Sequence, residues 1–326
     1  MYNEAVMMIS KDGSAPQAHL LFQPKKILKV TNAALTKEYQ NGIDWVFHKQ
    51  LTLLPNSKAR FMTEKELFPD STGRFPRKGG GTVFHSEGTY FHERQLVVTY
   101  THHRKQWKGP VSQPDNLVLA RTSKKLKQKE KLHILLYGDS ISAGANASGS
   151  SNTAPNLPDW RNLFVQNLRN HFGTEIKFTN TSVGGMDSKW GLKNVDSLVN
   201  HYAPDLVIIA FGMNDGTGKM SPQLFGNNIK GMMKKVRDQN PTSEFILVAP
   251  MLPNPESLFT GTQPAFKAVL DTIAKEHHAA EVDMTSVHEA LLKHKSYQDM
   301  TGNNINHPND FLMRWYAQMA SGLFIK

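Results

Sequence analysis

Hydrophobic positions follow one pattern up to about residue 110 and another from Leu132 onward. In the first part, short apolar runs are separated by turn-forming segments such as LPNS, PDSTG and KGGG. Runs of this length between turn signals are typical of short β-strands. The predicted strands are HLLF, ILKV, DWVF, TVFH and QLVVTYTH. The first part of the chain is therefore expected to be rich in β-structure.

From Leu132 onward, apolar runs typical of buried strands alternate with segments of helical periodicity. Buried strands are predicted at LHILLY, IKFTN, DLVIIAF and EFILVAP. Helices are predicted over residues 160–172, 222–238 and 264–277, with a last helix around 311–319. Because alternating strands and helices indicate βαβ units, we expect an α/β domain with a parallel sheet.

The two patterns predict a β-rich N-terminal domain over residues 1–121, a basic linker over 122–131 and an α/β domain over 132–326. The linker, TSKKLKQKEK, is rich in lysine. A lysine-rich segment can bind nucleic acid, but no RNA- or DNA-binding signature accompanies this one. We therefore interpret it as a solvated linker or an exposed helix, and we expect no nucleic-acid partner.

Composition limits the available chemistry. The length of 326 residues fits two domains, and the net charge of +10 favours anionic neighbours without choosing among them. The absence of cysteine excludes thiolate nucleophiles, disulfides and cysteine-containing metal sites. The histidine pairs at 102–103 and 277–278 lack the i, i+4 spacing of a zinc-binding helix, so no metal site is predicted. Catalysis would have to come from Ser, His, Asp, Glu or Lys.

No membrane-spanning segment is expected, because no apolar run approaches the ~20 residues that such a helix needs. The start of the chain, MYNEAVMMISKDGS, also lacks the basic region and the long apolar region of a secretory signal.

Four segments place reactive or small residues at the ends of predicted strands or at the start of a helix. Ser140 follows LHILLY in the segment GDSIS, and Gly185 follows the second strand in SVGGMD. Asn214 follows the third strand in GMNDG, and His307 precedes the last helix in NHPND. Any one of these segments is most often a turn or a helix cap. In a parallel sheet, however, ligands bind at the carboxyl ends of the strands, where three of these segments lie.

Taken in order, the four segments resemble the sequence blocks of the SGNH (GDSL-like) hydrolase family, and the resemblance extends over residues 132–326. It implies a flavodoxin-like three-layer α/β/α fold and ester hydrolysis without a metal or organic cofactor. It also implies that Ser140 is the nucleophile and His307 the general base. The oxyanion donors would be the backbone of Ser140 and Gly185 and the side chain of Asn214. These roles agree with elementary chemistry, since serine is a weak nucleophile until a neighbouring base takes its proton.

One position departs from the family pattern. The family usually has an aspartate three residues before the histidine, and this chain has Asn304 there. A neutral amide can accept a hydrogen bond from the ring, but it cannot balance the charge of an imidazolium. Three alternatives follow: a Ser–His dyad whose ring is held by Asn304 or a backbone carbonyl, an acid from elsewhere such as Asp299 or Asp310, or an impaired enzyme. We favour the dyad because the other blocks are intact.

The β-rich first domain resembles the sandwich or jelly-roll domain that is joined to an SGNH domain in some carbohydrate esterases. This second resemblance rests on domain order and strand density, and it implies an acetylated polysaccharide or oligosaccharide as substrate. Such a substrate would favour a secreted or periplasmic location. The alternatives are a lipid or thioester hydrolase of the same family, and a glycan-binding protein with impaired catalysis.

Overall fold

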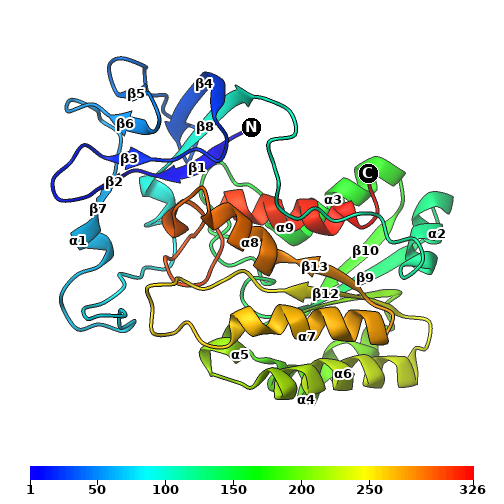
Figure 1. The fold of residues 1–326 in the computed structure, drawn as a ribbon. Helices are drawn as coiled ribbons and strands as arrows, with labels where there is room; N and C mark the ends of the chain where they lie inside the picture. The colour runs from blue at the N-terminus through cyan, green and yellow to red at the C-terminus, as the bar shows by residue number, and fades with distance from the viewer.

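The computed structural model describes residues 1–326 and contains an N-terminal β-rich region and a C-terminal α/β region (Figure 1). The α/β region is built on a five-stranded, fully parallel sheet with the strand order β10-β9-β11-β12-β13. Its strands are β9 (Leu132–Gly138), β10 (Ile176–Asn180), β11 (Leu206–Ala210), β12 (Glu244–Ala249) and β13 (Ala280–Asp283). The strand order reverses beside β9, which is where this type of sheet forms a ligand-binding crevice.

Helices cover both faces of the sheet, so the α/β region has the expected three layers (Figure 1). One face is covered by α3 (Trp160–Phe172), α8 (Met284–Leu292) and α9 (Asp310–Gly322). The other face is covered by α4 (Ser188–Leu198), α6 (Pro222–Gln239) and α7 (Gln263–Glu276). Shorter helical segments are α2 (Ala120–Gln128), α5 (Met213–Thr217), η2 (Asn200–Tyr202) and η3 (Tyr297–Asp299).

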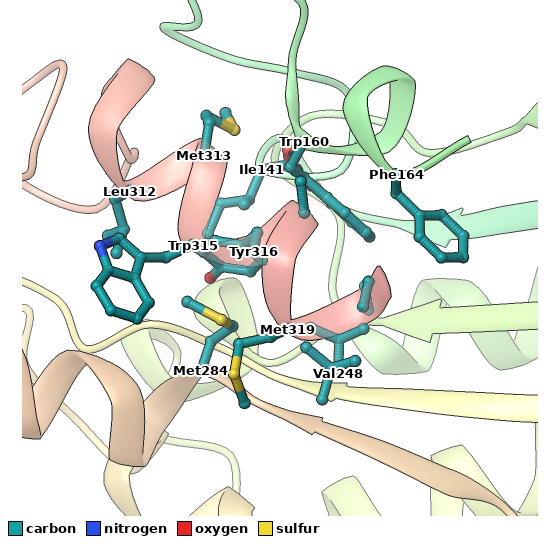
Figure 2. Close-up of a cluster of buried hydrophobic side chains, with 14 of the residues drawn as sticks. Ile141, Trp160, Phe164, Val248, Met284, Leu312, Met313, Trp315, Tyr316 and Met319 are labelled. Carbon is teal, nitrogen blue, oxygen red and sulfur yellow. Dashed lines mark hydrogen bonds between the residues drawn. The ribbon is translucent and has the colours of Figure 1, made fainter. Parts of the chain in front are cut away.

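The side chains of α9 pack against the sheet and against α3, and this packing fixes two loops of the sheet edge (Figure 2). The buried Trp160 of α3 donates a hydrogen bond from Nε1 to the carbonyl oxygen of Ile141, at 3.2 Å. The hydroxyl of Tyr316 on α9 accepts a hydrogen bond from the backbone N–H of Met251, at 2.9 Å. The core therefore holds the loops that follow β9 and β12.

The N-terminal region is a sandwich of two small sheets. In the first, β8 (Gln95–His102) lies between β1 (Glu4–Met7) and β4 (Pro24–Asn32), and both pairings are antiparallel. The second sheet has the order β5-β6-β3-β2-β7. Its strands are β2 (Ile9–Ser10), β3 (Gln17–Ala18), β5 (Trp45–Phe47), β6 (Leu51–Leu53) and β7 (Met62–Thr63). The helical segments are α1 (Glu64–Leu67) and η1 (His92–Arg94). Buried side chains from both sheets form one core.

Two local predictions differ from the structure. The segments HLLF (19–22) and TVFH (82–85) are not strands, although both bury apolar side chains. Their backbone N–H groups form hydrogen bonds to side chains and turns instead of to a neighbouring strand. The N–H of Leu21 donates to the carboxylate of Glu4, and the N–H of Val83 donates to the carbonyl oxygen of Phe75. For the segment 122–131, of the two expected forms, a solvated linker and an exposed helix, the structure has the helix, and its Lys124 and Lys127 are exposed. The segment lies mostly in α2, whose Leu126 is buried in the core of the α/β region.

The two regions share a buried ionic contact. The ammonium of Lys295 lies 2.6 Å from the carboxylate of Glu4, and both side chains are completely buried. The hydroxyl of Tyr100 donates to the same carboxylate at 2.6 Å. A second contact joins the loop around Arg77 to the loop around Glu256, whose side chains pair at 2.9 Å. These two ion pairs hold the N-terminal region beside the loops that carry the candidate site.

None of the helices combines the length and the apolar character that crossing a membrane requires.

Candidate active site

Ser140 lies in the tight turn that follows the central strand β9. The carboxylate of Asp139 accepts a hydrogen bond from the backbone N–H of Ile141 at 3.0 Å, which stabilises the turn. Burial raises the pKa of Asp139 to about 7. Ser140 itself is only half-buried, so its hydroxyl lies at the end of the strand where a ligand can reach it.

His307 lies directly before α9, and its imidazole reaches Ser140. The distance between Nε2 of His307 and Oγ of Ser140 is 2.9 Å. The backbone N–H of His307 donates to Oδ1 of Asn303 at 3.0 Å, and the carbonyl of His307 accepts from Thr301 at 3.0 Å. The structure thus brings together the two residues that the sequence motifs single out, in the geometry that a nucleophile and its base require.

The second ring nitrogen, Nδ1 of His307, lies 2.7 Å from Oδ1 of Asn146. The orientation of this amide is fixed, because its Nδ2 donates to the carbonyl oxygens of Gly88 and Gly302 at 3.2 and 3.3 Å. An amide oxygen only accepts hydrogen bonds, so Nδ1 must carry the ring proton of the neutral imidazole. Nε2 is then unprotonated and can accept the proton of the Ser140 hydroxyl.

A carboxylate from the N-terminal region also faces the ring. Oε2 of Glu87 lies 3.4 Å from Nδ1 of His307. Its other oxygen is 3.0 Å from Nε2 of His85 and accepts a hydrogen bond from Asn303, also at 3.0 Å. Partial burial raises the pKa of Glu87, but the contacts with His307 and His85 outweigh that effect and hold the pKa below its usual range. Glu87 is therefore an anion at neutral pH.

The loop of Gly185 lies beside Ser140, because a Cβ atom at Gly184 would lie 3.7 Å from the Cβ of Ser140. The backbone N–H groups of Ser140 and Gly185 donate no hydrogen bond within the protein. Nδ2 of Asn214 donates to the carbonyl of Met186 at 3.0 Å, which places the amide beside the loop of Gly185. Asn214 follows Gly212, whose φ of 131° is a conformation that side-chain-bearing residues rarely adopt. These groups can donate to a negatively charged oxygen that forms next to Ser140.

The sequence analysis named three residues as alternatives for holding the ring, and none of them contacts His307. Oδ1 of Asn304 accepts from Asn254 and Gln298, and its Nδ2 donates to the carbonyl of Phe84. Asp299 is buried near Lys295 and accepts the backbone N–H of Met7. Asp310 accepts the backbone N–H of Ser148. The expectation that Asn304 orients the ring is therefore wrong, because its side chain is fully used in joining loops.

Sequence reasoning missed both side chains that lie beside Nδ1 of the ring. Asn146 belongs to the small-residue run AGANAS that follows Ser140. It is the one residue of that run with a side-chain amide, and this amide was the signal for a hydrogen-bonding partner near Ser140. Glu87 carries no recognisable signal, since it lies in a loop of another domain and belongs to no motif. No group of three or more acidic or imidazole side chains converges in a way that would hold a metal ion.

Ser140 is half-buried, and the side chain of His307 is largely buried. Five cavities of the structure are lined by neither residue. The largest, of about 770 Å³, lies between α3 and α9 and is lined by Leu163 and Trp315 among others. It is lined by none of the four residues that the sequence motifs single out.

With this geometry established, comparison with known proteins identifies the family. The model of the GDSL-like Lipase/Acylhydrolase family matches residues 136–314, which is more than half of the 326 residues. The chain belongs to this family. The family resemblance carried by the four sequence segments is thereby confirmed, and all of the proposed site residues except Glu87 lie within the matched range.

Two relatives show how far the family likeness extends. An arylesterase from Vibrio mimicus is 30% identical over 105 residues, which make up 32% of this chain and 48% of that protein. The chain thus matches about half the length of this curated relative. A two-domain esterase active on acetylated mannans, solved with mannopentaose, superposes with a TM-score of 0.53 and 21% identity. That match covers 65% of this chain and 53% of the other, and at this identity it shows a shared fold.

Proposed function

We propose that this GDSL-family protein is a serine esterase that removes acetyl groups from a polysaccharide or oligosaccharide. The observation that carries the proposal is the 2.9 Å contact between Ser140 and His307, with the ring proton of His307 directed away from Ser140 by Asn146. This arrangement has the orientation of a nucleophile that is about to lose its proton to a general base.

The reaction follows from these positions. Oγ of Ser140 attacks the ester carbonyl carbon while Nε2 of His307 takes the hydroxyl proton. The carbonyl oxygen becomes negatively charged, and the backbone N–H groups of Ser140 and Gly185 and the amide of Asn214 stabilise it. The imidazolium then gives its proton to the departing sugar oxygen as the ester bond breaks. Water, deprotonated by the same nitrogen, hydrolyses the acyl-enzyme to acetate and restores Ser140.

One feature near the site supports an acetylated carbohydrate as the substrate. Partly exposed aromatic rings lie close to His85: the ring centroid of Phe75, in the N-terminal region, is 4.6 Å from that of His85 and 5.1 Å from that of Phe259 in the α/β region. Aromatic faces of this kind can stack on sugar rings. The fold shared with an esterase active on acetylated mannans is consistent with this substrate.

The test is a substrate panel for the intact chain, the Ser140→Ala variant and a matched control, Ser150→Ala. Ser150 is an exposed serine of the same loop. We expect hydrolysis of p-nitrophenyl acetate and release of acetate from acetylated mannan or xylan, both lost by roughly 10⁴-fold or more in Ser140→Ala. Ser150→Ala should retain wild-type rates.

Three outcomes would contradict the proposal in different ways. A preference for acyl chains of eight or more carbons would favour the lipid or thioester hydrolase of the sequence analysis. Glycan binding without turnover would favour a binding protein with impaired catalysis. Equal activity in the wild type and Ser140→Ala would exclude Ser140 as the nucleophile.

A further inference from the structure

Two hydrogen-bond acceptors, one neutral and one negatively charged, lie beside the same nitrogen of the His307 ring, Nδ1. The neutral oxygen of Asn146 lies 2.7 Å from Nδ1, and the carboxylate of Glu87 lies 3.4 Å from it. In a serine hydrolase, the third residue normally has two tasks. It fixes the tautomer and orientation of the ring, and it balances the positive charge that forms when the ring takes the serine proton. A neutral amide can perform only the first task.

We propose that the two tasks are divided in this protein: Asn146 fixes the ring, and Glu87, a positioning residue supplied by the N-terminal region, balances the charge that forms on His307. This inference rests on the proposed function, since it concerns the base of the same reaction. It makes the N-terminal region part of the catalytic machinery rather than a separate accessory domain.

The carboxylate of Glu87 is held in place for this task. Its Oε1 contacts His85 and Asn303, each at 3.0 Å, which leaves Oε2 for the ring of His307. The same Asn303 accepts the backbone N–H of His307 through Oδ1. One side chain therefore positions both members of the charge pair, and a preorganised anion needs little rearrangement as charge develops.

Asn146 is held just as closely. It has a φ of 63°, a left-handed conformation that asparagine tolerates better than most residues. Gly302 packs directly against it, because a Cβ atom at position 302 would lie only 2.4 Å from the Cβ of Asn146. The amide nitrogen of Asn146 donates hydrogen bonds to the carbonyl oxygens of Gly88 and Gly302. The amide oxygen is thereby kept facing His307.

The other charged groups around His307 do not replace Glu87. Asp139 forms no hydrogen bond or ion pair with the ring, because its carboxyl group accepts the backbone N–H of Ile141, and burial raises its pKa. Asp310 is engaged with the backbone of Ser148. His85 contacts Glu87 rather than His307. Glu87 is thus the ionised carboxylate in contact with the ring.

The experiment compares Glu87→Gln with the wild type and with Glu93→Gln, using kcat/KM for p-nitrophenyl acetate as a function of pH. Glu93 is a suitable control because it pairs with Arg60 and Thr89, away from the ring. We expect Glu87→Gln to lower kcat/KM by roughly 10- to 100-fold, mostly through kcat. The acidic limb of its pH profile should move down by about one pH unit, since an adjacent anion favours the imidazolium.

A merely structural role for Glu87 would reduce activity without moving the acidic limb. The conservative variant Glu87→Asp keeps the charge and should keep the limb close to its wild-type position. If Glu87→Gln matches Glu93→Gln in both kcat/KM and the position of the limb, the inference is wrong while the proposed function stands.

A second readout does not depend on turnover. If no ester is hydrolysed in a Ser140-dependent way, the proposed function fails, and the titration of the His307 ring can still be followed by ¹⁵N NMR. The midpoint should be lower in Glu87→Gln than in the wild type or Glu93→Gln. An unchanged midpoint would overturn the charge-balancing role, whatever the activity.

Discussion

Asn214 is the proposed oxyanion donor whose side chain can be removed with least disturbance, because its amide has a single hydrogen bond, to the carbonyl of Met186. We expect Asn214→Ala to lower kcat by roughly 10²- to 10³-fold with little change in KM, since the lost donor acts mainly on the transition state. Asn194→Ala is the control, because Asn194 bonds only within α4. Steady-state kinetics on p-nitrophenyl acetate measure both. A loss below about threefold would remove Asn214 from the oxyanion hole.

Single residues also show where sequence-based prediction reaches its limit. Ser140 and His307 could be predicted because each lies in a short motif next to a strand or a helix. Glu87 could not, because its proximity to His307 arises only when two domains pack together. The position of Asn304, three residues before His307, predicts that its side chain orients the ring. Its left-handed backbone, with a φ of 65°, and its three side-chain contacts place it in the loop framework instead.

Among the elements, the edge strand β13 has the weakest sequence signal in the parallel sheet. Its four residues, AEVD, form too short and too charged a segment to stand out from the surrounding sequence. Pairing with β12 makes it a strand: Ala280 and Val282 are buried, while Glu281 is half-buried beside the carboxyl of Asp271. The long, fully apolar strands could be predicted because burial on both faces leaves little freedom in their composition.

The same strand provides a pH-dependent prediction. Burial, and then the neighbouring Asp271, raise the pKa of Glu281 from an ordinary 4.5 to about 9. The folded state therefore binds the proton of Glu281 more tightly than the unfolded state does. The contribution of this proton to the free energy of unfolding is full below about pH 4.5 and is lost as the pH rises to about 9.

Glu281→Gln removes this ionisation. We expect the variant to be more stable than the wild type by on the order of 1 kcal/mol at pH 8, with a smaller difference at pH 5. Urea unfolding at the two pH values measures the effect, and Glu276→Gln, at an exposed position near the end of α7, is the control. A variant that is equally stabilised at both pH values, or destabilised at pH 8, would contradict the assignment.

At the scale of the whole molecule, the interface between the two regions contains a buried charge cluster. Lys295 lies 2.6 Å from Glu4 and 3.8 Å from Asp299, and all three side chains are almost entirely buried. The β-strand and helix patterns predict each region separately, but they contain no information on this interface. Glu4 lies at the opposite end of the chain from Lys295 and Asp299, and each of the three looks like an ordinary surface charge in the sequence.

Removing one charge from this cluster should destabilise the whole protein. Lys295→Met leaves Glu4 buried without its cation, which typically costs ~3–5 kcal/mol. We expect that loss in the free energy of unfolding, measured by urea denaturation, and a smaller effect in Lys293→Met, whose side chain is exposed. Equal stability of the two variants would show that the cluster does not hold the regions together.

The central claim is that Ser140, activated by His307, is the nucleophile of this GDSL-family protein. The most direct measurement is labelling of the intact chain with a serine-directed organophosphate, followed by peptide mass mapping. We expect a single phosphorylated serine at position 140, one label per chain, and a large loss of labelling rate in His307→Ala. Labelling of another serine, or an unchanged rate without the imidazole, would contradict the claim.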